Sequence, residues 1–301
     1  MTKKKKPAPP PAKKTENNVQ ARKSNVFVNG RYRFNLQEQK ILLQIISKIR
    51  MDEKEFSSYF VPWPELKAIS KNYLDSAKKI DESCEKLKNK TIKIKKGNEE
   101  ENFGFLSGWR TVPGQGVHFR IDPGMKEMLL DLLGEGNFTL FRLECAMSLS
   151  SAHSIRLYEI FKSEQWKKQP VLLSLDKIKF ALDIDKGNAS YADFGNFRTQ
   201  ILDRAQKALK EHTDIVFSYI PVKEGRKVVA LEITIKDNAK YQRTIQSEAV
   251  SQDTQFLAPG DKVVIAGKEY EFTGSGIIMG ESAMPVGELI KWIKQGKAKK
   301  I

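Results

Sequence analysis

The chain has 301 residues, of which 40% are hydrophobic and 30% are charged. This length suits two domains of ordinary size plus a small addition, and the apolar content is too high for a disordered chain. The apolar stretches are short and interrupted by charge, which excludes a membrane-spanning helix, and the amino terminus lacks the apolar core of a secretory signal. We therefore expect a cytoplasmic protein without a membrane partner.

The net charge is +15, from 52 Lys and Arg against 37 Asp and Glu. Residues 1–23 hold eight basic groups and one acidic group, so that 8 − 1 = +7 is concentrated there and the other 278 residues carry +8. The lysines flank a run of prolines at 9–11, and this composition predicts a disordered basic arm over residues 1–24. A basic body with a basic arm favours a polyanionic partner, of which nucleic acid is the first candidate.

The first predicted domain spans residues 25–137. Asn35 and Glu38 have the spacing of a capping box, and the apolar residues that follow recur at helical spacing to about residue 50. The other expected elements are an extended piece at 25–28, a strand at 56–61, helices from 63 and over 73–89, strands at 91–95, 103–111 and 117–121, and a helix at 124–133. Helix, strand, helix, helix and hairpin is the element order of a winged helix.

The second predicted domain, 138–240, repeats this order about 110 to 120 residues later. Its expected elements are a helix within 150–166, a short apolar run at 171–173, a helix at 175–182, a loop at 183–192, a helix at 194–212, and strands at 215–220 and 228–235. The fold class is therefore α+β, with two tandem winged-helix domains. A polar linker is expected at 241–256, and a small β-rich module of unknown role at 257–301.

No motif with catalytic chemistry stands out in the sequence. A phosphate-binding Gly-x-x-x-x-Gly-Lys-Ser/Thr loop is absent, and the three histidines are 35 and 59 residues apart, which is not a metal-ligand spacing. Cys84 and Cys145 cannot build a disulfide framework, so we expect both to be small buried side chains. We predict no enzymatic activity, no cofactor and no metal.

Two helices with basic outer faces, each followed by a hairpin, are the candidate DNA-binding surfaces. Such a helix can enter the major groove while basic groups on the hairpin reach phosphates. A basic face can also be mere solvated surface, but its recurrence in a repeated unit favours DNA. The candidate residues are Lys71, Lys78, Lys79 and Lys86 in the first domain, and Asn196, Arg198, Thr199, Arg204, Lys207, Lys210, Lys223, Arg226 and Lys227 in the second. Of these, Arg198 and Thr199 are the candidates for base readout.

Several segments resemble the replication initiators of iteron-bearing, theta-replicating bacterial plasmids. They are Asn25-Val26-Phe27 with the helix at 36–49, Ser150-Ser151-Ala152-His153-Ser154-Ile155-Arg156-Leu157-Tyr158-Glu159, the run at 175–179, and residues 197–214. The resemblance covers about residues 25–237 and is most specific at Ser-Ile-Arg-Leu-Tyr-Glu. It implies tandem winged helices that bind direct origin repeats in the bacterial cytoplasm, open the duplex, recruit host replication proteins and repress their own gene as dimers at an inverted repeat.

Two alternatives remain open at this stage. One is a transcriptional repressor that never initiates replication. The other is an origin-nicking enzyme with Tyr158 or Tyr191 as nucleophile, although the small number of histidines counts against the metal ligands that such an enzyme needs.

Overall fold

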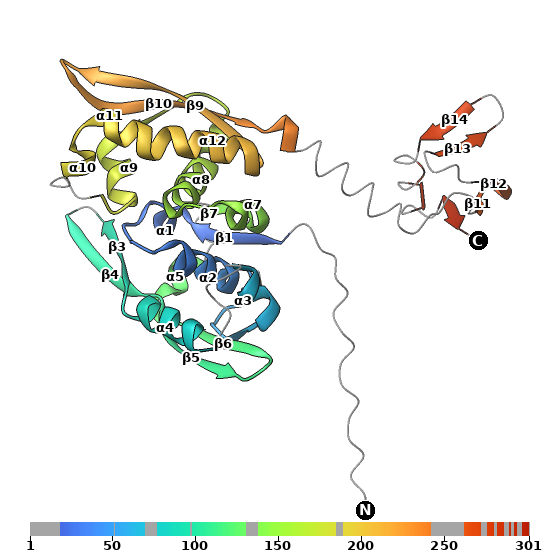
Figure 1. The fold of residues 1–301 in the computed structure, drawn as a ribbon, viewed down its shortest axis with the longest axis horizontal. Helices are drawn as coiled ribbons and strands as arrows, with labels where there is room; N and C mark the ends of the chain where they lie inside the picture. The colour runs from blue at the N-terminus through green and yellow to red at the C-terminus, as the bar shows by residue number, and fades with distance from the viewer. Residues whose placement is uncertain are drawn as a thin grey trace, which may run out of the picture. The chain divides into compact units, whose positions relative to one another are not determined.

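The computed structural model describes residues 19–50, 52–69, 77–96, 98–130, 138–184, 189–241, 262–271, 276–279, 282–285, 289, 292–293 and 297–300. These residues belong to two compact units, Met1–Asp237 and Asn238–Ile301. The larger unit holds both winged helices, with the first in its lower part and the second in its upper part in Figure 1. Every helix among the described residues is too short or too polar to cross a membrane.

The first winged helix is built from three helices and a three-stranded antiparallel sheet. Its elements are α2 (Leu36–Ile46), β2 (Ser58–Pro62), α3 (Trp63–Ile69), α4 (Ala77–Lys88), β5 (Leu106–Val112) and β6 (Gly116–Ile121), and its strand order is β2-β6-β5. The expected capping box is present, because Asn35 accepts from the amide of Glu38 and Glu38 accepts from the amide of Asn35. The side chains of Ile80, Cys84 and Leu87 are buried and form the inner face of α4.

The first domain contains two hairpins where the sequence suggested one. A separate hairpin, formed by β3 (Thr91–Lys96) and β4 (Glu99–Gly104), lies outside the β2-β6-β5 sheet. Its two strands carry the lysines and glutamates of this region. The hairpin of the winged helix itself, β5–β6, turns through 113–115, which is Pro-Gly-Gln and uncharged. The short η1 (Pro123–Met125) and α5 (Lys126–Leu129) occupy part of the helix expected at 124–133.

The second winged helix has the same topology as the first. Its elements are α8 (Ala152–Glu164), η2 (Gln165–Lys167), β8 (Val171–Ser174), α9 (Leu175–Ala181), α10 (Ala189–Ala192), α11 (Phe194–Phe197), η3 (Arg198–Leu202), α12 (Asp203–His212), β9 (Ile215–Glu224) and β10 (Lys227–Asp237). Its strand order, β8-β10-β9, places the first strand beside the last, as β2-β6-β5 does. This shared order confirms two tandem winged helices. The short helix α10 lies inside the loop that the sequence predicted at 183–192.

The elements around the junction of the two domains differ from the sequence-based expectation. Residues 25–28 form part of the helix α1 (Asn25–Asn29), which Ser24 caps by accepting from the amide of Phe27, and not an extended piece. Residues 20–24, expected to belong to the disordered arm, form β1 (Gln20–Ser24), which pairs antiparallel with β7 (Phe138–Arg142). The helix α7 (Leu143–Ser148) then leads into α8. The β1–β7 ladder crosses the domain boundary that we expected between residues 137 and 138.

A buried ionic cluster lies beside this ladder. Lys23 is fully buried on β1, and its Nζ lies 2.7 Å from Oε1 of Glu159 on α8. Arg156 Nη1 donates to Oε2 of the same carboxylate at 2.7 Å, and the Tyr32 hydroxyl donates to that oxygen at 3.3 Å. Burial lowers the pKa of Lys23 to about 8, although Glu159 acts to raise it. The cluster therefore explains why the Ser-Ile-Arg-Leu-Tyr-Glu segment contains two charged residues on an otherwise buried helix face.

Arg156 also joins the two winged helices. Its Nη2 donates to the carbonyls of Val28 and Gly30 at 2.7 and 3.0 Å, and to that of Ala181 in the second domain at 3.3 Å. A second link is the ion pair from Arg31 Nε to Asp183 Oδ1 at 2.5 Å. One side chain thus satisfies carbonyl groups of both domains, which holds the two DNA-binding candidates within one compact unit.

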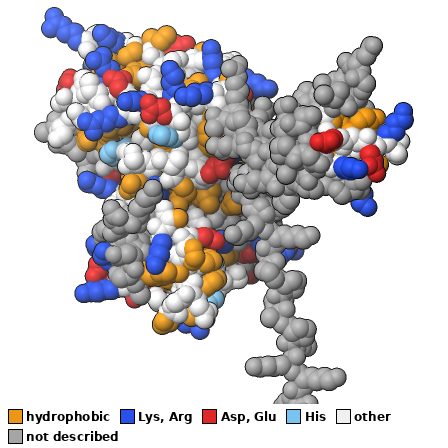
Figure 2. Space-filling view, turned by 45° about the vertical axis from the view of Figure 1, so that its right-hand side comes forward, with side chains coloured by type: hydrophobic (Ala, Val, Ile, Leu, Met, Phe, Trp, Pro, Cys, Tyr) orange, Lys and Arg blue, Asp and Glu red, His pale blue; other side chains and the backbone are white. Residues whose placement is uncertain are grey.

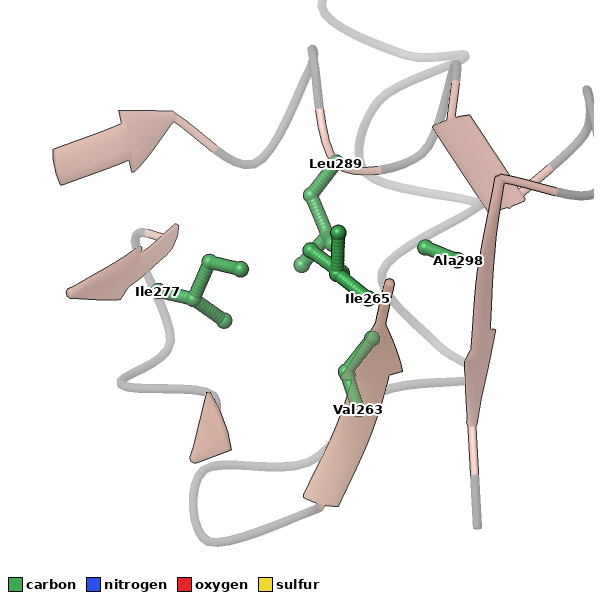
Figure 3. Close-up of a cluster of buried hydrophobic side chains, with 5 residues drawn as sticks. All are labelled: Val263, Ile265, Ile277, Leu289 and Ala298. Carbon is green, nitrogen blue, oxygen red and sulfur yellow. The ribbon is translucent and has the colours of Figure 1, made fainter. Parts of the chain in front are cut away.

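The smaller unit is rich in β-structure, which confirms the expected character of this module. Its strands are β11 (Lys262–Ile265), β12 (Lys268–Glu271), β13 (Gly276–Met279), β14 (Ser282–Pro285) and β15 (Ala298–Lys300), in the orders β12-β11-β15 and β13-β14. Val263, Ile265, Ile277, Leu289 and Ala298 form its small core (Figure 3). Apart from Tyr241, the expected linker at 241–256 lies outside the described residues.

Candidate nucleic-acid interface

The long helix predicted at 194–212 is present, but it is not a regular α-helix throughout. Asp193 caps its start by accepting from the amide of Asn196, and α11 continues directly through η3 into α12. The η3 segment is a π-helical turn, in which the amide of Asp203 donates to the carbonyl of Arg198, five residues earlier. The extra residue in this turn places Ile201, Leu202, Ala205 and Leu209 together on the buried face of the helix.

All six predicted DNA-binding residues on this helix are exposed, as the sequence suggested: Asn196, Arg198, Thr199, Arg204, Lys207 and Lys210. The Thr199 hydroxyl donates back along the helix to the carbonyls of Gly195 and Asn196, at 3.1 and 3.3 Å. Gln206 is half-buried, and its side-chain amide donates to the carbonyl of Phe217 on β9 at 2.9 Å. This bond fixes α12 against the sheet of the same domain.

Sequence reasoning missed the surroundings of Arg198. Its Nε lies 3.8 Å from Oδ2 of Asp203, and the hydroxyl of Tyr219 on β9 donates to Oδ1 of that carboxylate at 2.6 Å. Burial, together with the adjacent carboxylate, raises the pKa of Tyr219 above its ordinary value, so the phenol keeps its proton. Neither partner carries a sequence signal of its own, because Asp203 reads as an outward helix residue and Tyr219 as a strand residue.

The hairpin tip of the second domain presents three predicted residues, Lys223, Arg226 and Lys227, all of them exposed. Lys227 pairs with Glu224 at the end of the ladder, and Gly225 has φ = +60°, a conformation that favours glycine. The tight turn therefore projects basic side chains beyond the end of the sheet, and the β9–β10 hairpin is the longest in the described part of the chain (Figure 1).

The corresponding helix of the first domain is α4. Lys78 and Lys86 are exposed on it and Lys79 is half-buried, whereas Lys71 lies outside the described residues. Asp81 anchors α4 to β5 by accepting from Trp109 Nε1 at 2.9 Å and from the hydroxyl of Thr111 at 2.7 Å. This anchor fixes the orientation of α4 relative to the sheet, as Gln206 does for α12.

On the face of the larger unit shown in Figure 2, basic and acidic side chains are interspersed. The candidate interface is therefore defined by its elements, the two helices and one hairpin. Within the described residues, no group of three or more His, Cys, Asp or Glu side chains is arranged to hold a metal ion.

Tyr158, a candidate nucleophile of the nicking alternative, is inaccessible. Its side chain is fully buried, and its hydroxyl donates to Oδ1 of Asp214 at 2.8 Å. Burial raises the pKa of this phenol well above its ordinary value, and the carboxylate of Asp214 adds to the effect. Tyr191 is half-buried, and its carbonyl accepts from Lys179 at 2.7 Å. The environment of Tyr158 is that of a structural residue and opposes formation of a phenolate nucleophile.

Comparison with known proteins matches both winged helices. The family model described as initiator replication protein WH1 matches residues 20–162, and that described as initiator Rep protein WH2 matches residues 174–235. The first match begins at β1 and ends within α8, and thus extends past the expected boundary at residue 137. It includes both partners of the β1–β7 ladder and of the ion pair between Lys23 and Glu159.

One curated relative is the PI protein of Escherichia coli, which is 28% identical over a match that covers 56% of this chain. The chain spans 62% of the length of that relative. A solved structure, the Pi initiator protein in complex with iteron DNA, has the same fold, with a TM-score of 0.61 and 18% identity. That match covers 74% of this chain and 98% of the solved one. With both of its winged helices matched by the family's own models, the chain belongs to the family of initiator replication proteins.

Proposed function

We propose that this protein is a plasmid replication initiator that binds directly repeated sequences of double-stranded DNA at an origin. The observation that carries the proposal is the duplication itself: two winged helices with the same strand order, held in one unit by Arg156, each with a helix that presents basic side chains to solvent. Two linked readers can span a repeat that one domain would recognise weakly. The relative solved in complex with iteron DNA supports this ligand.

Within the interface, Arg198 and Thr199 contact base edges, while the other predicted residues contact phosphates, which the basic ones among them neutralise. On α11, η3 and α12 the contacts are Asn196, Arg204, Lys207 and Lys210; on the hairpin they are Lys223, Arg226 and Lys227; in the first domain they are Lys71, Lys78, Lys79 and Lys86. Arg198 lies in the amino-terminal half of its helix, where a helix inserted in a groove approaches the bases.

Binding to the repeats leads to the later steps of initiation. The bound initiator opens the duplex and recruits host replication proteins in the bacterial cytoplasm, and a dimer represses the initiator's own gene. In this proposal the protein acts by binding DNA and not by catalysis. The burial of Tyr158 favours a binding protein over a nicking enzyme.

Footprinting of the purified protein on the DNA that flanks its gene tests the proposal. We expect protection of direct repeats of about two helical turns each, if both domains bind one face of the duplex, and opening of an adjacent segment in supercoiled plasmid. Protection of a single promoter-proximal inverted repeat, without opening, would support a repressor instead. A nicked product after incubation with magnesium would support the nicking enzyme.

A further inference from the structure

An acidic residue stands in the middle of the proposed DNA-reading surface. Asp203 is flanked by exposed Arg198, Arg204 and Lys207, and its side chain is 47% exposed. A carboxylate at this place repels DNA phosphates and so opposes the general attraction that its neighbours supply. Its contacts suggest a different role, because one carboxylate oxygen faces Arg198 Nε at 3.8 Å and the other accepts from Tyr219 at 2.6 Å.

The π-helical turn makes this arrangement possible. In an α-helix each residue rotates by about 100°, so residues five apart point about 140° away from each other. The wider turn of η3 closes a hydrogen bond between residues 198 and 203, which stacks these two positions on the same face. The sheet of the same domain then contributes Tyr219, whose hydroxyl fixes the carboxylate from the other side.

We propose that Asp203 and Tyr219 are positioning residues that orient the guanidinium of Arg198 for guanine readout; this inference rests on the proposed function. The carboxylate faces Nε, at the base of the guanidinium. The opposite edge, formed by Nη1 and Nη2, has the spacing of guanine O6 and N7 in the major groove. Arg198 is 53% exposed, so this edge can reach a partner outside the protein. Orientation before binding reduces the entropy that the side chain loses on contact with the base.

The two possible roles of Asp203 predict different effects of its substitution on the ratio of cognate to random affinity. If the carboxylate is only a charge on the surface, Asp203→Asn strengthens binding to every DNA sequence by the same factor. If it positions Arg198, the same substitution strengthens binding to random DNA but lowers the ratio of cognate to random affinity. Tyr219→Phe separates the effects further, since it removes the hydroxyl and leaves all charges in place.

The experiment measures Kd for a protected direct repeat and for a random duplex of equal length. We expect the ratio of the two affinities to fall about fivefold or more in Asp203→Asn, to fall by a smaller factor in Tyr219→Phe without tighter binding to random DNA, and to fall the most in Arg198→Ala. Adding Asp203→Asn to Arg198→Ala should leave the ratio where Arg198→Ala put it. Glu211→Gln, an exposed charge change on the same helix, is the matched control and should leave the ratio unchanged.

The bound base can be probed directly by repeats with 7-deazaguanine, which lacks N7, at single positions. At one position this replacement should weaken wild-type binding and have no effect on Arg198→Ala. A ratio that is unchanged in both Asp203→Asn and Tyr219→Phe, at unaltered unfolding midpoints, overturns the inference, as does an Arg198→Ala variant that discriminates as well as wild type. A wild-type protein that does not prefer the repeat to random DNA would instead contradict the proposed function.

Discussion

At the scale of single residues, the exposed cations of the second domain differ in how firmly they are held. Arg198 has a carboxylate partner on its own helix, whereas Arg226 and Lys227 project from a hairpin turn. A guanidinium whose orientation is fixed by a partner is suited to hydrogen bonds with a base edge, which has a fixed geometry. A cation without such a partner is suited to contacts with the phosphate backbone.

Arg198→Ala should therefore cost about 1–3 kcal/mol of binding free energy on the direct repeat and little on random DNA, because a base contact is lost. Competition binding with both duplexes at one salt concentration measures this. Equal losses on the two sequences would reassign Arg198 to a phosphate contact.

The hairpin residues should behave in the opposite way. Single alanine substitutions of Lys223, Arg226 and Lys227 should each reduce the slope of log affinity against log salt by about one or less and leave sequence preference unchanged, since each removes at most one phosphate contact. Titrations at several salt concentrations give the slope. A change in preferred sequence at constant slope would contradict this assignment.

Lys23 gives a pH-dependent contribution to stability. Its pKa in the folded protein is about 8 because burial disfavours the charged form, and its ordinary value is 10.5. Between these values the unfolded chain binds a proton that the folded protein lacks, so the free energy of unfolding rises with pH through this window. Relative to Lys23→Met, wild type should gain about 2 kcal/mol between pH 7.5 and 9.5, as measured by denaturant unfolding. If the free energy of unfolding changed with pH by the same amount in both proteins, this prediction would be wrong.

At the scale of elements, local patterns predicted most of the fold. The sequence predicts the helices α2 and α8 and the hairpin β9–β10, because the residues that define each of these elements lie close together in the sequence. The strand β1 and the helix α1 were wrongly assigned, since a short basic segment becomes a strand only through pairing with β7, more than a hundred residues later. The π-helical turn was not predicted either, because no local signal in the sequence distinguishes it from a regular helix. The partners of Arg198 were missed for the same reason.

The position of β1 divides the basic arm into two parts with different roles. Residues 1–18 carry six Lys and one Glu, a charge of 6 − 1 = +5, whereas residues 20–24 complete the β1–β7 ladder. We predict that deletion of residues 1–18 weakens binding to the repeat and to random DNA by the same factor and leaves the footprint and the unfolding midpoint unchanged.

Deletion of residues 1–24 should also lower stability by several kcal/mol, because it removes the β1–β7 ladder and one of the two buried cations, Lys23 and Arg156, that face Glu159. Thermal unfolding of the two truncated proteins checks the difference. If both deletions are equally stable, the ladder contributes nothing to the fold; if the shorter deletion reduces the footprint, residues 1–18 contact a defined groove.

At the scale of the whole molecule, two different DNA-binding domains follow one another in a fixed order along one chain. A monomer built in this way suits a direct repeat. A twofold dimer suits an inverted repeat. The outer face of α4, with Lys78, Lys79, Glu82 and Lys86, has the mixed charge that either DNA or a second copy of the chain could contact.

We predict that sedimentation near micromolar concentration detects a dimer that binds the inverted repeat, and that dilution or mild denaturant increases binding to direct repeats by populating monomer. The mass of the complex on each DNA identifies the bound species. Binding to direct repeats that rises with the fraction of dimer would show that the dimer is the only reader.

The β1–β7 ladder also determines when the protein can fold during its synthesis. Lys23 leaves the ribosome early, but its partner Glu159 is made 136 residues later. Until then, the amino-terminal segment has an unpaired strand edge and a lysine without its carboxylate. We therefore expect β1 to pair and Lys23 to meet its carboxylate only after translation has entered the second domain, so a nascent chain that stops near residue 137 should be more sensitive to proteases than the full chain.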